Sequence, residues 1–298
     1  MITRYTTPNV IRLGYPTQNL TIPASTNRTC RLANLCDAKK VRGLIRENLA
    51  DLNTIVPWNA GHGIQLFRMG QSLVPFAFHP QFPYDWVEEH GEELGRAGKL
   101  ARSLDVRLSM HPGQYIQPGS LKPEVVERSL TELRSGARIL DLIGNPDSAL
   151  VLHMGGGYED KAATAARFIE TMRQEENVLK YLVLENDERI WTVADIVKAA
   201  HALGIPAITD TLHHDLNPGN LSLKVALDLS LQSWEDRGAR PKLHLSSQDP
   251  KKQSGAHAYS VDLTDWERLV EALQNGEADI MVEAKGKERA LVPMGIKF

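Results

Sequence analysis

The chain has 298 residues, with 34 lysines and arginines against 37 aspartates and glutamates, which gives a formal net charge of -3. Its hydrophobic fraction of 42% and charged fraction of 24% are ordinary for a folded globular protein and exclude disordered and collagen-like classes. Two cysteines, Cys30 and Cys36, cannot crosslink a chain of this length, so we expect reduced thiols and a cytoplasmic protein. No run approaches the roughly 18 apolar residues of a membrane span. The slight negative charge argues mildly against a broadly basic surface that grips nucleic acid.

Short apolar runs alternate with longer amphipathic stretches along the chain, and eight of these runs are typical of strands. Most of them are continuously hydrophobic rather than alternating, as in strands that are covered on both faces. The expected strands cover residues 10–15, 64–70, 106–110, 149–153, 181–185, 205–210, 242–246 and 279–283.

The segments between these runs have the pattern of amphipathic helices. One of them has Pro123 in its first turn and Gly144 just beyond its end, the usual asymmetry of helix termini. Helices are expected over residues 37–59, 88–104, 123–143, 160–175, 192–203, 222–234 and 264–274.

Eight strands separated by helices predict an α/β fold, a single (β/α)8 TIM barrel over residues 10–298 with a short or missing last helix. Residues 1–9 are interpreted as an N-terminal extension. A doubly wound open sheet is the main alternative, but the chain has no glycine-rich turn after its first strand and no phosphate-binding loop motif.

Histidines and carboxylates gather where the expected strands end, which is the edge at which barrel enzymes carry their active sites. Imidazole nitrogen combined with carboxylate oxygen, without thiolate, suits Zn²⁺, Mn²⁺ or Fe²⁺. Eight such side chains are enough to bind two or three divalent ions. Clustered divalent ions are typical of enzymes that hydrolyse phosphate esters. The candidate ligands are His111, His153, Glu185, Asp210, His213, His244, His257 and Glu283.

Other histidines have simpler interpretations. His214 is adjacent to His213 in the chain and is expected to point elsewhere. His62, His90 and His201 lie in or beside helical segments and are expected to face solvent.

Lys242 is an unusual residue for this place in the barrel. It lies two positions before His244 on one expected strand, so the two side chains face the same side. Bound cations would repel an ammonium group there. The lysine is therefore either paired with a carboxylate or phosphate, or modified, and a carbamylated lysine would present a carboxylate to the ions.

Several long motifs resemble those of the UV damage endonucleases, a family of TIM-barrel DNA repair enzymes related to endonuclease IV. The resemblance extends from about residue 10 to residue 288. The motifs are VIRLGYPTQN at 10–19, MHPGQY at 110–115, VLENDE at 183–188, DTLHH at 210–214, LHLSSQD at 243–249 and VEAKGKE at 282–288. The resemblance implies that the chain acts on damaged double-stranded DNA and cuts the backbone immediately 5′ of UV photoproducts. Manganese is the metal that the family usually uses, and no obligate protein partner is implied.

The resemblance also implies how three divalent ions would share the ligands, with Glu185 bridging the first two. The first ion would be held by His111, His153 and Glu185, the second by Glu185, Asp210, His244 and Glu283, and the third by His213, His257 and a carboxylated Lys242. Catalytic roles would fall on Glu185, Lys242 and His244.

Four residues match positions that contact DNA in the family. Gln114 and Tyr115 match the pair that probes the duplex and fills the gap left by a flipped lesion, and Tyr15 and Asn19 match positions lining the damage pocket. An exposed amide and aromatic ring could stack on bases, at about 1–3 kcal/mol per stacked base. Without the resemblance, the simpler interpretation is that Tyr115 caps the barrel rim.

These observations predict a DNA repair endonuclease that leaves a 3′-hydroxyl and a 5′-phosphate, with Mn²⁺ as the expected ion and Zn²⁺ or Co²⁺ as alternatives. Photoproducts bend easily and damaged pairs open at lower cost, so we also expect activity at abasic sites. The enzyme would work in the cytoplasm, on the nucleoid in a prokaryote. Two other functions stay open, a metal-dependent sugar isomerase on the same barrel and a non-catalytic damage-recognition module with a structural metal.

Overall fold

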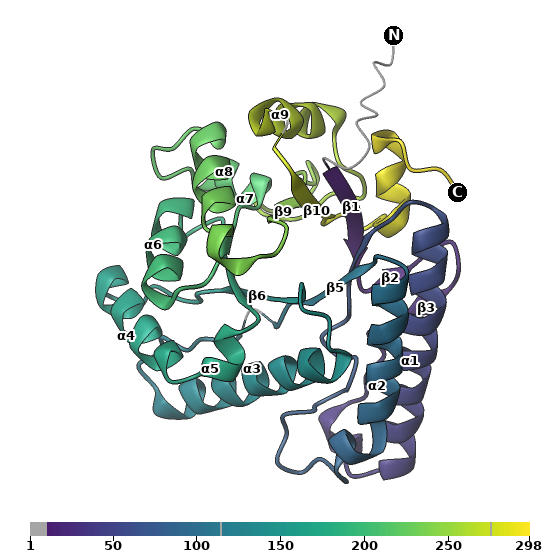
Figure 1. Ribbon diagram of the computed structural model, residues 1–298. Helices are drawn as coiled ribbons and strands as arrows, with labels where there is room; N and C mark the ends of the chain where they lie inside the picture. Colours follow the sequence, from purple (N-terminus) through teal and green to yellow (C-terminus); the bar gives the residue numbers. More distant parts are fainter. Residues whose placement is uncertain (1–10, 114, 275) are drawn as a thin grey trace.

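Parallel strands form the centre of the structure, and helices surround them (Figure 1). The protein is represented by a computed structural model that describes residues 11–113, 115–274 and 276–298. Within these residues the barrel has eight strands, β1 (Ile11–Pro16), β4 (Leu66–Arg68), β5 (Arg107–Met110), β6 (Ala149–His153), β7 (Leu182–Glu185), β8 (Ala207–Ile208), β9 (Lys242–Leu245) and β10 (Ala278–Val282). The eight expected strands are confirmed, with boundaries that differ by a few residues. The expected extension at residues 1–9, and residue 10, lie outside the described residues.

Strands that follow one another in the chain are also neighbours in the sheet, and all their pairings are parallel. The order in space is β8-β7-β6-β5-β4-β1-β10-β9. The two outer strands meet just past β8, where Asp210 forms a bridge with His244 and the His244 amide donates to the Thr209 carbonyl at 3.0 Å. The sheet is therefore a nearly closed barrel, and the carboxyl ends of its strands meet at one mouth.

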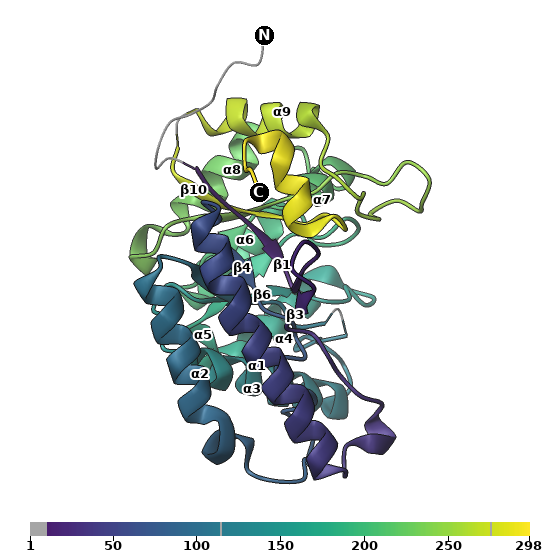
Figure 2. The same cartoon turned by 90° about the vertical axis from the view of Figure 1, so that its right-hand side faces the viewer.

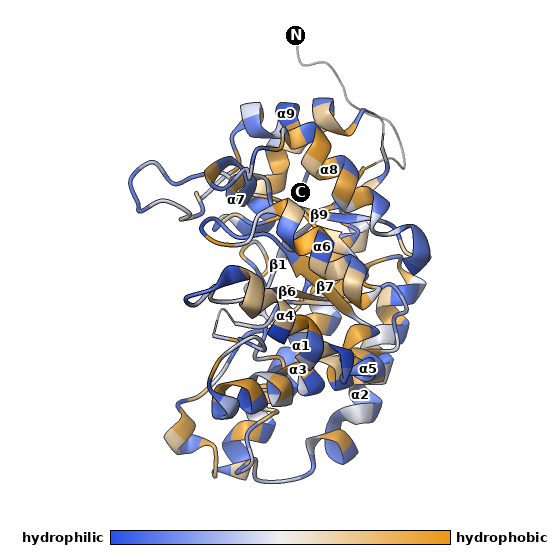
Figure 3. Cartoon of the chain, turned by 90° about the vertical axis from the view of Figure 1, so that its left-hand side faces the viewer, coloured by the Kyte–Doolittle hydropathy of each residue, from blue (hydrophilic) through white to orange (hydrophobic). Residues whose placement is uncertain are grey.

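The helices lie outside the strands, and Figure 3 shows apolar residues gathered on the strands and on the helix sides near them. They are α1 (Ala38–Gly61), α2 (Trp86–Ser103), α3 (Pro123–Ile143), α4 (Lys161–Arg173), α5 (Glu176–Leu179), α6 (Val193–Leu203), α7 (Thr211–Leu216), α8 (Leu223–Gln232) and α9 (Leu263–Leu273), with 3-10 helices η1 (Leu32–Asn34), η2 (Glu235–Arg237) and η3 (Lys287–Met294). A short antiparallel hairpin, β2 (Gln18–Asn19) and β3 (Ala24–Ser25), follows β1. Among the described helices, none is long and apolar enough to cross a membrane.

Local signals explain most helix boundaries. The Asp37 carboxylate accepts the Lys40 amide at the start of α1, and Thr192 and Asp195 form a reciprocal capping box at the start of α6. Gly144 and Gly204 end α3 and α6 with a φ of 65°, a left-handed conformation that glycine adopts without strain. These helices therefore begin and end close to the predicted positions.

The last helix is short, as predicted, and it is a 3-10 helix rather than an α-helix. Figures 1 and 2 show η3, in yellow, beside β1 and one end of α1. Phe298 contacts Trp58 of α1, with ring centroids 5.3 Å apart. The C-terminal segment thus takes the place of the eighth outer helix.

A buried ion cluster lies at the end of the barrel opposite the mouth. Asp279, near the start of β10, is fully buried and accepts hydrogen bonds from Arg12 Nε at 2.7 Å and from Arg107 Nη1 at 2.8 Å. The three residues come from β1, β5 and β10, so the cluster joins strands across the barrel interior. A substitution that keeps the shape of a side chain in this cluster but removes its charge leaves the partner charges buried. No opposite charge then compensates them.

We therefore predict that Asp279→Asn lowers the free energy of unfolding by about 3–5 kcal/mol. The matched control is Asp105→Asn, because Asp105 pairs with the same Arg12 at 3.1 Å but its side chain is 74% exposed. That variant should change the free energy by less than about 1 kcal/mol. Urea denaturation of the two variants measures both values, and equal effects would contradict a role for the buried cluster.

Candidate metal centre

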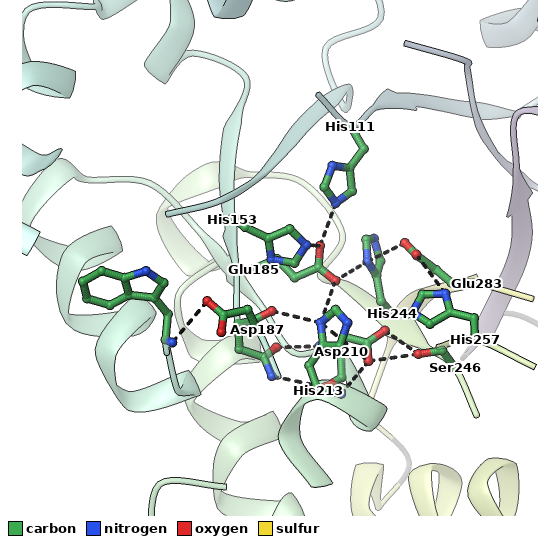
Figure 4. A network of polar contacts seen from close by, with 12 residues as sticks. His111, His153, Glu185, Asp187, Asp210, His213, His244, Ser246, His257 and Glu283 are labelled. Atoms are coloured by element: carbon green, nitrogen blue, oxygen red, sulfur yellow. Dashed lines mark hydrogen bonds and ion pairs between the residues drawn. The ribbon is translucent and has the colours of Figure 1, made fainter. Parts of the chain in front are cut away.

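All the described candidate ligands lie at the mouth of the barrel (Figure 4). His153 and Glu185 are the last residues of β6 and β7, His244 lies within β9, and His111 and Glu283 directly follow β5 and β10. Asp210 follows β8 and caps α7, and this short helix carries His213. His257 lies in the loop after β9, where its ring is 5.9 Å from that of His213.

Glu185 is the centre of the cluster. One carboxylate oxygen, Oε2, lies 3.0 Å from His111 Nε2 and 3.5 Å from His153 Nε2. The other, Oε1, lies 2.8 Å from His244 Nδ1. The side chain is 1% exposed, so both oxygens contact these neighbours rather than solvent. A single carboxylate therefore links ligands from β5, β6 and β9.

Three sets of side chains offer nitrogen and oxygen atoms close enough to hold a cation, and every set includes Glu185. The sets are His111, His153 and Glu185; Glu185, Asp210 and His213; and Glu185, His244 and Glu283, each with ligand atoms within 4.8 Å of one another. The first set matches the one that the resemblance implies. The other two differ from it, since Asp210 groups with His213 rather than with His244 and Glu283.

Charges within the cluster favour ionised carboxylates. Burial opposes the charge of Glu185, but His244 and His153 and the hydrogen bond from His111 outweigh it and hold its pKa well below its ordinary value. Burial likewise opposes the charge of Glu283, and Arg68 together with His244 holds the pKa of that carboxyl well below its usual range. The site thus presents anionic oxygen, the form that a metal ligand needs.

The orientation of two histidines is fixed by backbone carbonyls. His111 Nδ1 lies 2.9 Å from the Pro112 carbonyl, and His213 Nδ1 lies 3.1 Å from the Asn186 carbonyl. A carbonyl oxygen only accepts, so each Nδ1 donates to its carbonyl and the ring is held in one orientation. The Nε2 edge of His111 therefore faces Glu185, and this nitrogen would bind a metal after giving up its proton.

The donor set fits divalent transition ions. It consists of imidazole nitrogens and carboxylate oxygens without thiolate, the mixture that Mn²⁺, Fe²⁺, Co²⁺ and Zn²⁺ accept. The nitrogens that face the carboxylates are His153 Nε2, 3.5 Å from Glu185, and His244 Nδ1, 2.8 Å from Glu185 and 2.9 Å from Glu283. Nitrogen and oxygen donors therefore converge on the same space, which supports the fit.

Two supporting residues were missed by sequence reasoning. Asn186 accepts the Asp210 amide at 2.8 Å and donates to the Asp210 carbonyl at 3.3 Å, extending the contact of β7 with the chain past β8. The Ser246 hydroxyl lies 3.0 and 2.9 Å from the two oxygens of Asp210. Their positions gave a usable signal, because Asn186 directly follows Glu185 and Ser246 follows His244 by two residues, on the same face of the strand.

Arg68 was also missed. It ends β4, and its Nη1 pairs with Glu283 Oε1. Arg68 lines the same cavity as His111, His153 and His257, a space of about 370 Å³ that opens at the mouth. The guanidinium therefore places a fixed positive charge beside the candidate ligands.

Lys242 lies one layer deeper than His244 and is buried. Its ammonium nitrogen donates to Ser109 Oγ at 2.7 Å, so the side chain crosses the barrel interior from β9 to β5. Burial, together with the charges of Arg107 and Arg68, lowers the pKa of Lys242 well below its ordinary value. The hydrogen-bond partner is thus a neutral hydroxyl rather than the carboxylate or phosphate considered above.

The residues matched to DNA contacts differ in exposure. Tyr15 and Asn19 are buried and form a hydrogen-bonded chain, in which Asn19 Nδ2 donates to the Tyr15 hydroxyl at 2.8 Å and that hydroxyl donates to Asn59 Oδ1 at 2.8 Å. Contacts with α1 cover both side chains, and their place in the lining of a damage pocket stays a prediction. Tyr115 is exposed, and Gln114 lies outside the described residues.

Three further histidines can be compared with their expected positions. His90, expected to face solvent, is buried, and its Nε2 lies 3.2 Å from the Tyr84 hydroxyl. That expectation was wrong because residues 84–90 fold back and cover the ring. His201 is exposed as expected, and His214 is buried outside the three ligand sets.

Comparisons with known proteins agree with this geometry. Residues 11–296 match the sequence model of a family described as UV-endonuclease UvdE. A UV DNA damage endonuclease of Bacillus cereus (strain B4264) is 30% identical over 95% of this chain and 92% of its own length. The crystal structure of SacUVDE superposes with a TM-score of 0.89 and 33% identity, covering 96% of this chain and 100% of that one.

A more distant likeness concerns the barrel itself. The crystal structure of 3-keto-D-glucoside 4-epimerase, YcjR, from E. coli superposes with a TM-score of 0.56 at 14% identity over 92% of each chain. Identity this low shows the fold alone and carries no argument for sugar chemistry. The near-complete family match, the close structural relative and the ligands at the barrel mouth together give one conclusion: the chain belongs to the UV-endonuclease UvdE family.

Proposed function

We propose that the chain cuts double-stranded DNA immediately 5′ of UV photoproducts, and also at abasic sites, by hydrolysis with bound divalent ions. The observation that carries the proposal is Glu185, one buried carboxylate shared by three sets of nitrogen and oxygen ligands. Relatives named UV DNA damage endonuclease supply the substrate class. A cavity open at the mouth suits a substrate as large as a duplex, of which only one phosphate needs to enter.

The ligand sets predict which residues would hold the ions, up to three of them, with Mn²⁺ as the expected metal and Zn²⁺ or Co²⁺ as alternatives. Bound ions would activate water for attack on the phosphorus and stabilise the leaving 3′-oxygen, which gives a 3′-hydroxyl and a 5′-phosphate. His257 lies 3.7 Å from Glu283 and extends the site toward the loop after β9. Its side chain is 24% exposed, and it belongs to none of the three ligand sets, so it would bind an ion together with Glu283.

Other side chains at the mouth would position the DNA. Arg68 is fixed beside Glu283, where its planar guanidinium can bind two oxygens of the scissile phosphate. Tyr115 projects from the rim with its ring exposed, where it can stack on a base next to the lesion. Hydrolysis and recognition would thus involve neighbouring parts of one surface.

Metal removal tests the function directly. Wild-type protein should nick UV-irradiated supercoiled plasmid, lose the activity after exhaustive chelation and regain it with Mn²⁺. Glu185→Gln should lower the incision rate roughly 100-fold or more, because it weakens all three ligand sets at once, while DNA binding is retained.

The matched control for that variant is Glu271→Gln, which changes an exposed glutamate of α9 and should nick at the wild-type rate. Nicking that survives chelation would contradict hydrolysis with bound ions. Binding of damaged DNA without nicking under any metal would instead support a recognition module.

We further propose that Lys242 is carboxylated. Burial lowers the pKa of Lys242 and so favours the neutral amine, whose lone pair can attack the carbon of CO₂; loss of one N–H proton to water then gives a carbamate anion. Arg68 and Arg107, whose charges disfavour the ammonium form, would stabilise this anion. The modified side chain would place an additional carboxylate in the layer next to His244.

Labelled bicarbonate gives a direct measurement of this modification. With ¹³C-bicarbonate, NMR of the wild-type protein should show a carbamate carbon that is missing in Lys242→Met. Lys224→Met, which changes a partly exposed lysine of α8, should retain the signal. Absence of the resonance from wild-type protein at high bicarbonate would reject the carboxylation.

A further inference from the structure

An exposed aromatic ring at the mouth of the barrel is fixed by its hydroxyl group. Tyr115 is 58% exposed, yet its hydroxyl donates to Glu132 Oε1 at 3.0 Å and accepts from Gln71 Nε2 at 2.6 Å. Gln71 Nε2 also donates to Glu132 Oε1. The ring therefore stands in solvent while its tip is held between α3 and the loop after β4.

The backbone beneath the ring restricts it as well. A Cβ atom added at Gly113 would lie 2.4 Å from Cε1 of the Tyr115 ring, so the ring rests directly on the backbone at this glycine. Glu132 accepts from the hydroxyl at the tip of the same ring, so the ring is restricted both at its face and at its tip.

A carboxylate is energetically unfavourable at the position that Glu132 occupies in the helix. Glu132 lies on the buried side of α3 beside Leu133 and Gly136, and it is 6% exposed. Burial raises its pKa, while hydrogen bonds from Tyr115 and Gln71 oppose the rise. A buried carboxylate whose partners are neutral donors is unfavourable for folding, and an apolar side chain would suit the helix better. Such local conflicts are expected at functional positions.

The segment that carries Tyr115 lies between two cavities. Below the ring lies a cavity of about 180 Å³, lined mainly by apolar residues that include Phe76, Met110 and Ile139. Gln71 and Pro112 line this cavity and also the cavity of the candidate metal centre. The Tyr115 hydroxyl is thus held beside an apolar cavity and next to the candidate metal centre.

We propose that Glu132 is a positioning residue for damage recognition, which holds the Tyr115 ring upright so that it enters the duplex already ordered. The inference rests on the proposed function and deepens it, because it names what sets the geometry of the recognition step. A ring that is ordered before binding loses little conformational entropy when it inserts between bases. Opening an intact pair should depend on this preorganisation more than cutting an already open site does.

The experiment compares two substrates that carry the same photoproduct, one fully paired and one opposite an unpaired bubble. Glu132→Leu should raise KM about tenfold on the paired duplex, by loss of preorganisation, and leave kcat within about twofold. On the bubble substrate its KM should match that of the wild type. Tyr115→Phe, which keeps the ring and loses the hydroxyl, should behave in the same way, and the two changes combined should raise KM no further.

Two controls separate positioning from folding. Glu132→Gln retains an acceptor oxygen for the Tyr115 hydroxyl and should recover most of the wild-type KM. Glu127→Leu changes a glutamate on the same helix whose side chain is 67% exposed, and it should leave both substrates unaffected. Thermal melting should show Glu132→Leu to be at least as stable as the wild type.

The outcomes distinguish this inference from the proposed function. Equal effects of Glu132→Leu on paired and bubble substrates, or effects that add to those of Tyr115→Phe, would overturn the positioning role. If wild-type protein cuts neither substrate, the proposed function fails. In that case fluorescence of 2-aminopurine placed opposite the lesion still tests the inference, since Glu132→Leu should reduce base unstacking on the paired duplex.

Discussion

The structure depends on one buried carboxylate, Glu185, that must be reached from several strand ends at once. Its two oxygens contact His111 and His244, which belong to opposite sides of the barrel, at 3.0 and 2.8 Å. Such contacts form only if the sheet closes, and it closes at the bridge between Asp210 and His244, two candidate ligands. Closing the barrel and assembling the site are therefore the same event. A relative with an open sheet would lack the site, whatever its sequence at these positions.

Polar side chains occupy successive layers of the barrel interior with different partners. At the far end, Asp279 pairs with both Arg12 and Arg107, and beside it in register on β9 lies Lys242, which donates to a hydroxyl. Two residues further along β9, His244 meets Glu185. The carboxylate at the far end thus meets guanidinium groups from the strands, whereas Glu185 at the mouth meets imidazoles that could bind ions. This difference separates the part of the barrel that stabilises the fold from the part that can accept ions.

Most of the fold and of the metal centre could be predicted from sequence, for physical reasons that also explain what was missed. Buried parallel strands are continuous apolar runs, and ligands at their carboxyl ends must converge. The helix α7 was missed because residues 211–216 follow a strand directly and carry ligand-type residues, which suggested a loop. Glu132 could not be recognised, since a glutamate in an amphipathic helix usually marks the solvent side. The resemblance located Tyr15 and Asn19 in the chain, but exposure depends on packing against α1, which no motif contains.

The net charge of the chain, which argued against DNA, is the wrong quantity for this molecule. The candidate metal centre concentrates the carboxylates Glu185, Asp210 and Glu283 in one place, with Arg68 as a fixed cation. Without ions, this mouth would repel a phosphate, and each bound divalent ion would reverse part of that repulsion at short range. Bound ions would then add affinity for the backbone locally, at the phosphate to be cut. A slightly acidic surface elsewhere would limit binding to undamaged DNA, where neither the ions nor the Tyr115 ring find a partner.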